Sequence, residues 1–399
     1  MVTAQYYRIK AGEVMSTIHK LPSRDFPVGP DSENAHTMPA RLYLDEAVYE
    51  KEKEAIFADT WHYIGHECQV QNPGDYLTLK IADESVFIMR GDDHVLRGFF
   101  NVCRHRAHQL LSGSGNTKSI ICPYHAWSYH DDGRLNRAPF TQSGEVDAKT
   151  HCLPTFHLQS ILGLVFIHLG DNPEPLASRF EGLEQYTSIF EPSRFNAVSP
   201  SSLEHWQANW KLIMENGMES YHLFKVHKET LETVTPSKLA YHVGGSSEWT
   251  VTGGEMQDDS GWLTKMLRGS YPKAYDHYLL LSLPPNFVGI MTYDSLGWLS
   301  VLPVDSQTSQ VRAAAISDSA LGREDAASKE FTEAFFAEDK VICERVQRGM
   351  SARVGKGGTL VEKERVVVDF HQYLASRLFG MTPTPHYDNP EATVFHAAP

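Results

Sequence analysis

Short apolar runs of β type alternate with turn-forming residues between Trp61 and about residue 169. The runs DYLTLKI, SVFIMR, LRGFFNV, SIICPY and LGLVFIHL are separated by NPGD, GDD, GSGN and DDGR. Such runs, bounded by Gly, Asp and Asn, are typical of strands joined by tight turns. This part of the chain is predicted to form a small antiparallel β domain.

Helical spacing dominates on both sides of that region. In LDEAVYEKEKEAIFADTW, apolar residues recur among charged ones at helical intervals, which predicts a helix. After the proline-containing stretch DNPEPLASRF, helical and strand-like segments alternate to the C-terminus. The pattern predicts an α+β protein with an irregular segment 1–40, a β domain with its preceding helix over 41–170, and a larger α+β domain over 171–399.

Composition narrows the possible partners and the compartment. The 399 residues carry a formal net charge of -14, which argues against a nucleic acid partner. No apolar run reaches the roughly 18 residues that a membrane span needs, and the N-terminus lacks the apolar core of a secretory signal. The five cysteines are odd in number and do not suggest a disulfide framework. We therefore expect a cytoplasmic protein.

Two short motifs, NVCRHRAHQL and CPYHAWSYH, each contain one cysteine close to one histidine. The pairs are Cys103 with His105 and Cys122 with His125. A structural zinc site usually takes two cysteines from one loop and two histidines from another element, and zinc remains the alternative. One cysteine and one histidine from each loop is the requirement of a Rieske [2Fe-2S] cluster, in which one iron has two thiolates and the other two imidazoles.

A second candidate metal site lies in NWKLIMENGMESYHLFKVHKETL. His222 and His227, with one distant carboxylate, would supply the two-histidine, one-carboxylate face of oxygen-activating iron(II). On a regular helix the two side chains would point about 140° apart, so we expect a distortion near Phe224 to Val226. The alternative is a pair of unrelated helix histidines. Asn216, in the same stretch, is a further candidate catalytic residue.

The carboxylate that would complete this site is expected to be an acidic residue on an otherwise apolar helix face. In KEFTEAFFAEDKVICERVQRGM, an apolar helical face contains Asp339, while Glu338 lies nearer its edge. That face is formed by Phe331, Phe335, Ile342 and Val346. An ionised carboxylate on an apolar face needs a positive partner. Iron would provide one, and an ion pair with Arg or Lys is the alternative.

CRHRAHQL and CPYHAWSYHDDGRL resemble the cluster loops of Rieske non-haem iron oxygenases, the large (alpha) subunits of ring-hydroxylating and N-demethylating systems. The family usually has glycine where this chain has Ala107 and Ala126, a departure expected to leave cluster binding intact. The resemblance implies an N-terminal antiparallel β Rieske domain, then a catalytic domain with a central antiparallel sheet flanked by helices. It also implies that Asp339, on a late helix, is the third ligand of a mononuclear iron.

Glu219 precedes His222 by three residues, so we expect the two to share a helix face. Its carboxylate would accept hydrogen bonds from a cluster histidine and from a ligand histidine. In the resembling family this bridge joins neighbouring subunits of a ring, commonly a trimer, which implies a homotrimer here. A glutamate at this position is similar to the branch that acts on quaternary ammonium compounds, although that branch often reads ECYHC where this chain reads ESYHL.

The chain lacks a nucleotide-binding fingerprint: GSGNTK has no third glycine, and GKGGT lacks the Walker spacing. Electrons from NAD(P)H would therefore arrive through a separate reductase or ferredoxin. The predicted function is that of a terminal oxygenase, which uses O2 to hydroxylate a small organic molecule. A Rieske electron carrier without catalysis is the alternative of another class.

The substrate is predicted to be a quaternary ammonium or N-methyl compound, with ring hydroxylation of an aromatic compound as the alternative. The C-terminal part contains aromatic residues that would form a cage around an ammonium group. They are Trp262, Tyr271, Tyr275, Tyr278, Tyr293 and Trp298. The alternative is that these side chains belong to the hydrophobic core.

Overall fold

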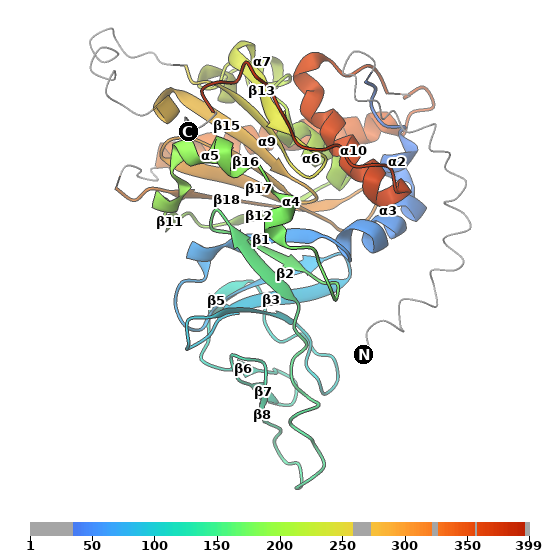
Figure 1. The fold of residues 1–399 in the computed structure, drawn as a ribbon. Coiled ribbons are helices and arrows are strands. Elements are labelled where there is room, and N and C mark those ends of the chain that lie inside the picture. Colours follow the sequence, from blue (N-terminus) through green and yellow to red (C-terminus); the bar gives the residue numbers. More distant parts are fainter. Residues whose placement is uncertain (1–34, 258–272, 321–325, 356, 396–399) are drawn as a thin grey trace. The chain divides into compact units, whose positions relative to one another are not determined.

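A computed structural model of the chain describes residues 35–257, 273–320, 326–355 and 357–395 (Figure 1). Contacts divide the described residues into two compact units. The smaller unit runs from Phe57 to Arg179, and the larger comprises the residues before and after it. The helix α3 (Glu46–Glu52), which the sequence grouped with the β domain, belongs to the larger unit by its contacts. The domain limits predicted at residues 40 and 170 remain predictions.

Three small antiparallel sheets build the smaller unit, with the strand orders β1-β10-β9, β4-β3-β2-β5 and β6-β7-β8. The strands are β1 (Trp61–His66), β2 (Asp75–Ile81), β3 (Glu84–Arg90), β4 (Leu96–Phe100), β5 (Ser114–Asn116), β6 (Ile120–Ile121), β7 (Ser128–Tyr129), β8 (Leu135–Arg137), β9 (His157–Ile161) and β10 (Leu164–His168). The antiparallel β domain predicted from the sequence is confirmed. GSGN, predicted as a turn, instead contributes the exposed edge strand β5, which pairs with β2.

The larger unit is built on a nine-stranded antiparallel sheet, with the order β11-β18-β17-β16-β15-β14-β13-β19 and β12 pairing with β18. The strands are β11 (Ala197–Val198), β12 (Ser202–Trp206), β13 (Ala240–Gly245), β14 (Thr250–Glu255), β15 (His277–Leu283), β16 (Phe287–Met291), β17 (Ser295–Pro303), β18 (Ser309–Ser317) and β19 (Tyr387–Asp388). The central antiparallel sheet predicted for the C-terminal part is confirmed.

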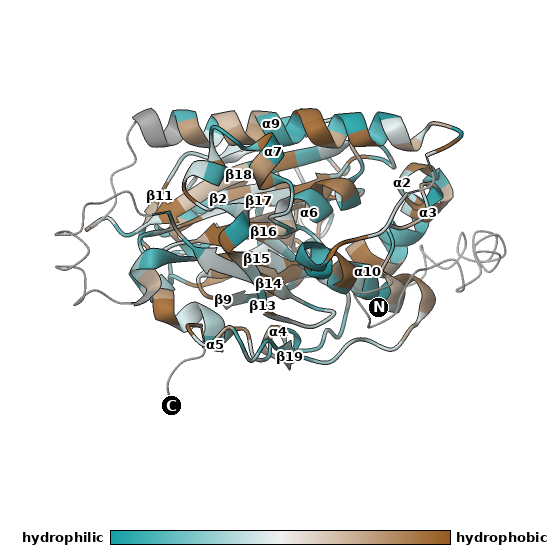
Figure 2. Cartoon of the chain, turned by 90° about the horizontal axis from the view of Figure 1, so that it is seen from above, coloured by the Kyte–Doolittle hydropathy of each residue, from teal (hydrophilic) through white to brown (hydrophobic). Residues whose placement is uncertain are grey.

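The larger unit also contains helices, of which α9 (Ala326–Met350) packs against both α6 (Trp210–Met218) and α7 (Leu223–Val226) (Figure 2). The α-helices of the larger unit are α2 (Arg41–Leu44), α3, α5 (Glu184–Thr187), α6 (Trp210–Met218), α7 (Leu223–Val226), α9 (Ala326–Met350) and α10 (Arg365–Phe379). Asn209, the residue before α6, caps this helix, since its side chain accepts the Lys211 N–H. Gly380, the residue after α10, ends this helix by adopting a left-handed conformation with φ 65°.

A buried ion pair ties α6 to α3. Lys211 and Glu52 are 1% and 0% exposed, and their charged atoms lie 2.5 Å apart. The indole of Trp210 donates a second hydrogen bond to Glu52, at 2.7 Å. Burial raises the pKa of Glu52 and lowers that of Lys211, while the pairing opposes both shifts. The pair therefore holds the start of α6, the helix that leads to the candidate iron site.

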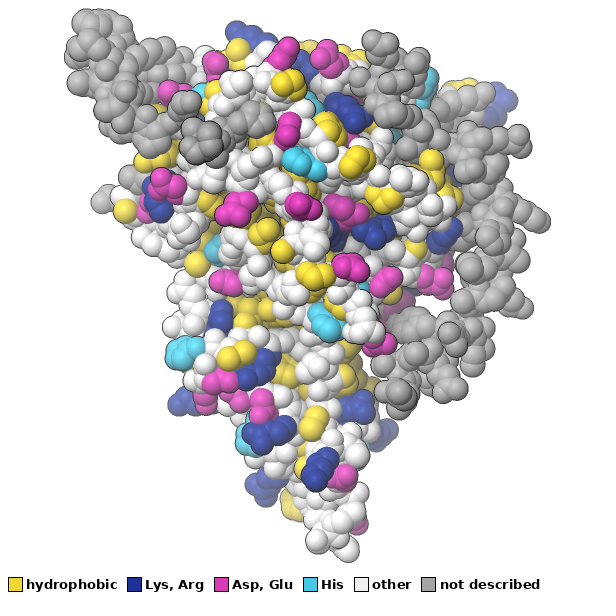
Figure 3. Space-filling model, in the orientation of Figure 1, with side chains coloured by type: hydrophobic (Ala, Val, Ile, Leu, Met, Phe, Trp, Pro, Cys, Tyr) yellow, Lys and Arg dark blue, Asp and Glu magenta, His cyan; other side chains and the backbone are white. Residues whose placement is uncertain are grey.

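Among the described residues, no helix is both long enough and apolar enough to cross a membrane. Acidic and basic side chains are mixed over the face of the molecule shown in Figure 3.

Glu52→Ala is expected to lower the free energy of unfolding by about 3–5 kcal/mol, because it leaves the Lys211 ammonium buried without its partner. Glu52→Ala combined with Lys211→Met should destabilise less than the sum of the two single changes. Denaturant unfolding of the three variants and the wild type measures both quantities. Additive effects of the two changes would show that the pair is not coupled.

Candidate functional site

The loops that begin at Cys103 and Cys122 have the same backbone pattern. In each, the cysteine N–H donates to the carbonyl five residues later, and the N–H four residues later donates back to the cysteine carbonyl. The bonds are Cys103 N to His108 O at 2.9 Å, Ala107 N to Cys103 O at 3.1 Å, Cys122 N to Trp127 O at 2.8 Å and Ala126 N to Cys122 O at 3.0 Å. The two loops therefore hold their cysteines in matching positions, while His105 follows its cysteine by two residues and His125 follows its cysteine by three.

Ala107 and Ala126 both adopt the left-handed conformation, with φ 56° and φ 54°. This conformation costs a residue with a Cβ about 1–2 kcal/mol, and glycine avoids that penalty. The positive φ therefore explains why the family usually has glycine at these positions. The hydrogen bonds described above keep both alanines in this conformation.

The thiols and the imidazoles of these loops lie in different surroundings. Cys103 and Cys122 are buried, whereas His105 and His125 are exposed, with their ring centres 4.7 Å apart. Trp127 stacks on His105 at 4.8 Å between ring centres. Two buried thiols and two exposed imidazoles match the donor set of a Rieske cluster, in which the imidazole iron lies at the accessible end.

Tyr129 contacts the first cluster loop and was not singled out from the sequence. Its hydroxyl accepts the Arg104 N–H at 3.0 Å and lies 3.3 Å from the sulfur of Cys103. The phenol proton is then available for that sulfur, and hydrogen bonds to cluster sulfurs help to set the reduction potential. The tyrosine next to the second loop, in SYH, was the signal in the sequence.

The chain breaks its helix between Asn216 and His222. α6 ends at Met218, Glu219 is extended with φ -113° and ψ 161°, and the single turn α7 follows His222 and precedes His227. The departure from a regular helix expected between the two histidines, near Phe224 to Val226, is confirmed as a helix end, because α7 ends at Val226 and His227 has φ -100° and ψ 31°. Because the helix does not continue through His227, the two histidine side chains can face the same side.

His222, His227 and Asp339 form the one group of three His, Cys, Asp or Glu residues in the described part of the chain whose ligand atoms all lie within 4.8 Å of one another. Asp339 Oδ1 lies 2.9 Å from His227 Nε2 and 3.5 Å from His222 Nε2. His227 and Asp339 are buried, and His222 is half-buried. Two imidazoles and one carboxylate fit iron(II) and leave open coordination positions.

Each histidine has a carboxylate on the ring nitrogen that faces away from Asp339. Glu219 Oε1 lies 2.5 Å from His222 Nδ1, and Glu338 Oε2 lies 2.8 Å from His227 Nδ1. The Thr230 hydroxyl also donates to Glu338, at 2.7 Å. Carboxylates in this position fix the tautomer and the orientation of a ligating histidine. Both Nε2 atoms are thereby directed to one point.

Sequence reasoning placed two of these groups differently. Glu219 meets His222 through a turn rather than on a shared helix face, since Glu219 lies just beyond the end of α6. Glu338 was predicted near the edge of an apolar face and was given no role. The predicted face was also wrong at Val346, which is 42% exposed, while Cys343 and Gln347 are buried below Asp339.

Asn216 donates to Asp339 Oδ1 at 2.7 Å and so helps to fix that carboxylate. Burial raises the pKa of Asp339, but hydrogen bonds from His222 and His227 outweigh it and lower the pKa to about 2. Burial lowers the pKa of His222, while Asp339 and Glu219 outweigh it and raise the pKa to about 10. The site therefore favours positive charge at the point where the three side chains meet.

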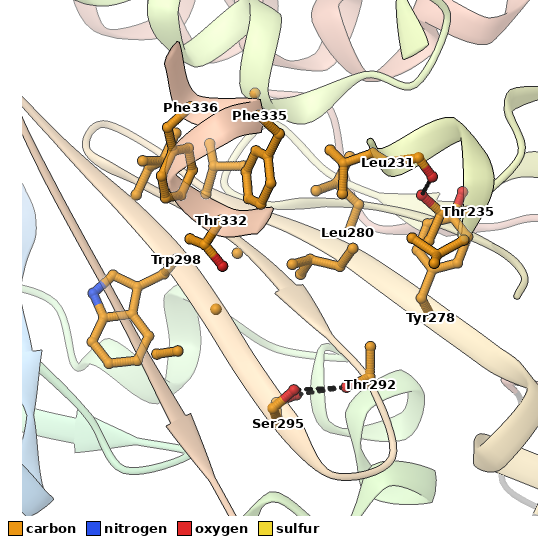
Figure 4. A pocket seen from close by; sticks show the side chains of 18 of the residues that line it. Leu231, Thr235, Tyr278, Leu280, Thr292, Ser295, Trp298, Thr332, Phe335 and Phe336 are labelled. Carbon is orange, nitrogen blue, oxygen red and sulfur yellow. Dashed lines mark hydrogen bonds between the residues drawn. The ribbon is translucent and has the colours of Figure 1, made fainter. Parts of the chain in front are cut away.

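A cavity of about 380 Å³ has these three residues in its wall. Five aromatic side chains are among the remaining lining residues: Tyr278, Trp298, Phe331, Phe335 and Phe336. Figure 4 shows Trp298, Phe335 and Phe336 on one side and Tyr278 with Thr235 on the other.

Two members of the proposed aromatic cage, Tyr278 and Trp298, lie in this lining. Tyr275 and Tyr293 do not line the cavity, and their rings contact each other at 5.5 Å between centres. Trp262 and Tyr271 lie outside the described residues.

Comparison with known proteins identifies the domain family of each unit. Residues 60–157 match the Rieske [2Fe-2S] domain, and residues 194–380 match the catalytic domain of the ring-hydroxylating alpha subunit. The chain is 32% identical to the carnitine monooxygenase oxygenase subunit of Acinetobacter pittii, over 90% of this chain and 96% of the relative. It is 33% identical to the glycine betaine monooxygenase oxygenase subunit of Chromohalobacter salexigens, over 50% of this chain and 45% of the relative.

Solved structures of similar proteins agree with these two domain families. A quaternary ammonium Rieske monooxygenase superposes with a TM-score of 0.78 and 27% identity, over 90% of this chain and 99% of the other. Naphthalene 1,2-dioxygenase superposes with a TM-score of 0.73 and 19% identity, over 89% of this chain and 94% of the other, and shows the shared fold.

The chain belongs to the Rieske non-haem iron oxygenases, as an alpha subunit. The family combines a [2Fe-2S] cluster with a mononuclear iron, and an oxygenase component receives its electrons from a separate reductase component. An electron carrier would not need the larger unit with its catalytic domain, so that alternative is wrong.

Glu338→Ala is expected to weaken the binding of the mononuclear iron about 10–100-fold, because His227 loses the group that orients it. Glu338→Gln should restore most of the affinity, since its amide oxygen still accepts the Nδ1 proton. Iron retained after dialysis against graded chelator measures the effect, with the cluster absorbance as internal reference.

Glu333→Ala, at an exposed position on the same helix, is the matched control, and His222→Ala marks complete loss of this iron with the cluster retained. Wild-type iron retention in Glu338→Ala would contradict the orienting role.

Proposed function

We propose that this oxygenase hydroxylates an N-methyl group of a small quaternary ammonium compound, in the cytoplasm. The observation that carries the proposal is the cavity in whose wall His222, His227 and Asp339 stand together with five aromatic side chains. Aromatic faces attract quaternary ammonium groups through cation–π interactions. Relatives named as carnitine and glycine betaine monooxygenase oxygenase subunits support this substrate class.

His222, His227 and Asp339 are the residues that would hold the iron, which supplies the activation of O2 when bound. Glu219 and Glu338 orient the two histidines, and Asn216 fixes the aspartate. The apolar aromatic wall limits the access of water to the substrate. One oxygen atom of O2 enters the methyl C–H bond and the other leaves as water, with two electrons and two protons consumed. The N-hydroxymethyl product then releases formaldehyde and the demethylated amine.

The four residues that would hold the cluster are Cys103, His105, Cys122 and His125. We propose that electrons pass from it to His222 of a neighbouring subunit through Glu219, within a homotrimer. The hydrogen bond between Glu219 and His222 supports this route, because it connects the carboxylate directly to a proposed ligand. The solved quaternary ammonium relative is described with inter-subunit electron transfer, which favours the same arrangement. NAD(P)H, acting through the reductase component, is the proposed electron source.

Hydroxylation of an aromatic ring is the second candidate. The apolar and aromatic lining of the cavity would also suit a flat ring, which stacks on or against such side chains.

A substrate panel with a compatible reductase distinguishes the two candidates. We expect formaldehyde from L-carnitine, glycine betaine or choline, in proportion to O2 consumed, and no dihydrodiol or phenol from naphthalene or benzoate. The measurements are formaldehyde release and chromatography of the ring products. Ring hydroxylation without formaldehyde would refute the proposed substrate class and favour the second candidate.

Glu219→Ala, loaded with iron to wild-type content, is expected to slow electron transfer from the cluster to the mononuclear iron at least about tenfold, because His222 loses its partner on Nδ1. Rapid-mixing spectroscopy of the reduced cluster during a single turnover measures the rate. Glu219→Asp should recover part of it, and Glu229→Ala, at an exposed neighbouring position, is the control. Wild-type rates in Glu219→Ala would remove Glu219 from the electron path.

A further inference from the structure

Tyr278 lies on β15 and lines the cavity that His222, His227 and Asp339 also line. It is 2% exposed. Its ring lies against Gly254, its partner on the neighbouring strand β14, since a Cβ added at that glycine would meet the ring and the hydroxyl at 2.7–2.9 Å. The absence of a side chain at Gly254 thus creates the space that the ring fills, and the hydroxyl has a defined position.

The buried hydroxyl of Tyr278 has no hydrogen-bond partner among the described residues. The nearby polar side chains make hydrogen bonds with other residues. The Thr235 hydroxyl donates to the Leu231 carbonyl at 3.0 Å, and Glu232 accepts from the N–H and the hydroxyl of Ser237. A buried hydroxyl without a partner is destabilising. Phenylalanine would fill the same space without that penalty, so the hydroxyl has no evident role in folding.

The hydroxyl of Tyr278 keeps its proton near neutral pH. Burial raises the pKa of this phenol well above its ordinary value, and the charge of Glu232 adds to the shift. A neutral phenol in the wall of the cavity is therefore available as a hydrogen-bond donor to a molecule that enters it.

We infer that Tyr278 is a substrate-binding residue whose hydroxyl donates a hydrogen bond to an oxygen atom of the substrate. This inference rests on the proposed function and narrows its substrate class. A quaternary nitrogen has no N–H and no lone pair, so it cannot be the partner of a hydroxyl. The substrate is then a quaternary ammonium compound that also carries a hydroxyl, carbonyl or carboxylate oxygen.

The two ends of such a substrate would meet different parts of the wall. Figure 4 shows Tyr278 on the opposite side of the cavity from Trp298, with Phe335 and Phe336 toward the Trp298 side. Aromatic faces there suit the ammonium end, and the phenol suits the oxygen end. Binding both ends fixes which carbon atom is presented for oxidation, which is the basis of positional selectivity.

The test compares Tyr278→Phe with the wild type on two matched pairs of compounds. The ammonium pair is γ-butyrobetaine with butyltrimethylammonium, and the ring pair is benzyl alcohol with toluene; in each pair the second compound lacks the oxygen. Calorimetric dissociation constants of the iron-loaded enzyme, without O2, are combined with kcat/KM. For the pair that the wild type binds, we expect it to prefer the oxygen-bearing compound about 10–100-fold, and Tyr278→Phe to abolish that preference.

Two further variants make the result specific. Gly254→Ala should reduce the same preference, because its Cβ displaces the ring. Tyr275→Phe, three residues away and outside the cavity lining, should leave the preference unchanged. The unfolding midpoint of Tyr278→Phe should not fall, because the lost hydroxyl has no hydrogen-bond partner in the part of the chain that the structure describes.

The outcomes separate this inference from the proposed function. Binding and oxidation of the ring pair alone would refute the quaternary ammonium substrate, and the preference within that pair would still decide the role of Tyr278. An unchanged preference in Tyr278→Phe, or a wild type that shows no preference within the pair it binds, would overturn the role assigned to this hydroxyl.

Discussion

A carboxylate buried on an apolar helix face is stable only where positive or hydrogen-bonding groups surround it. Asp339 is such a carboxylate, and the larger unit must supply its partners. Asn216 and His227 reach it at 2.7 and 2.9 Å, and His222 lies 3.5 Å away. These partners come from α6 and from the turns that follow it, so α6 and α7 must pack against α9 in one register. The buried pair of Lys211 and Glu52 secures the other end of α6. The position of the proposed metal-binding side chains thus follows from where charge can be buried.

The same helix supplies both a proposed ligand and the group that orients another ligand. Asp339 and Glu338 are adjacent on α9, and adjacent residues on a helix point about 100° apart. Asp339 therefore faces Nε2 of His227 while Glu338 reaches its Nδ1. His222 obtains its orienting carboxylate locally, from Glu219 three residues earlier. One histidine depends on tertiary packing for its orientation and the other on a turn of its own chain.

The two proposed iron centres differ in their exposure to solvent, which suits their separate tasks. In the smaller unit the thiols are buried and the imidazoles are exposed, as an electron-transferring cluster requires. In the larger unit the donor atoms line a cavity with aromatic walls, where a substrate and O2 can be held away from bulk water. Membership of the Rieske oxygenase family connects these two environments in one catalytic cycle.

The sequence by itself determined the antiparallel β domain and the two Cys and His loops, which are local in the chain, and it predicted His222, His227 and Asp339 as iron ligands. Spacing and residue type are sufficient for these, because a cluster loop or a buried acid is unusual wherever it occurs. The tertiary structure alone decided where the helix before His222 breaks, that Glu338 meets His227, and that the hydroxyl of Tyr278, in the cavity wall, has no hydrogen-bond partner among the described residues. Each of these depends on side chains brought together from distant segments. Helical or strand periodicity in the sequence does not indicate which distant segment packs on which face.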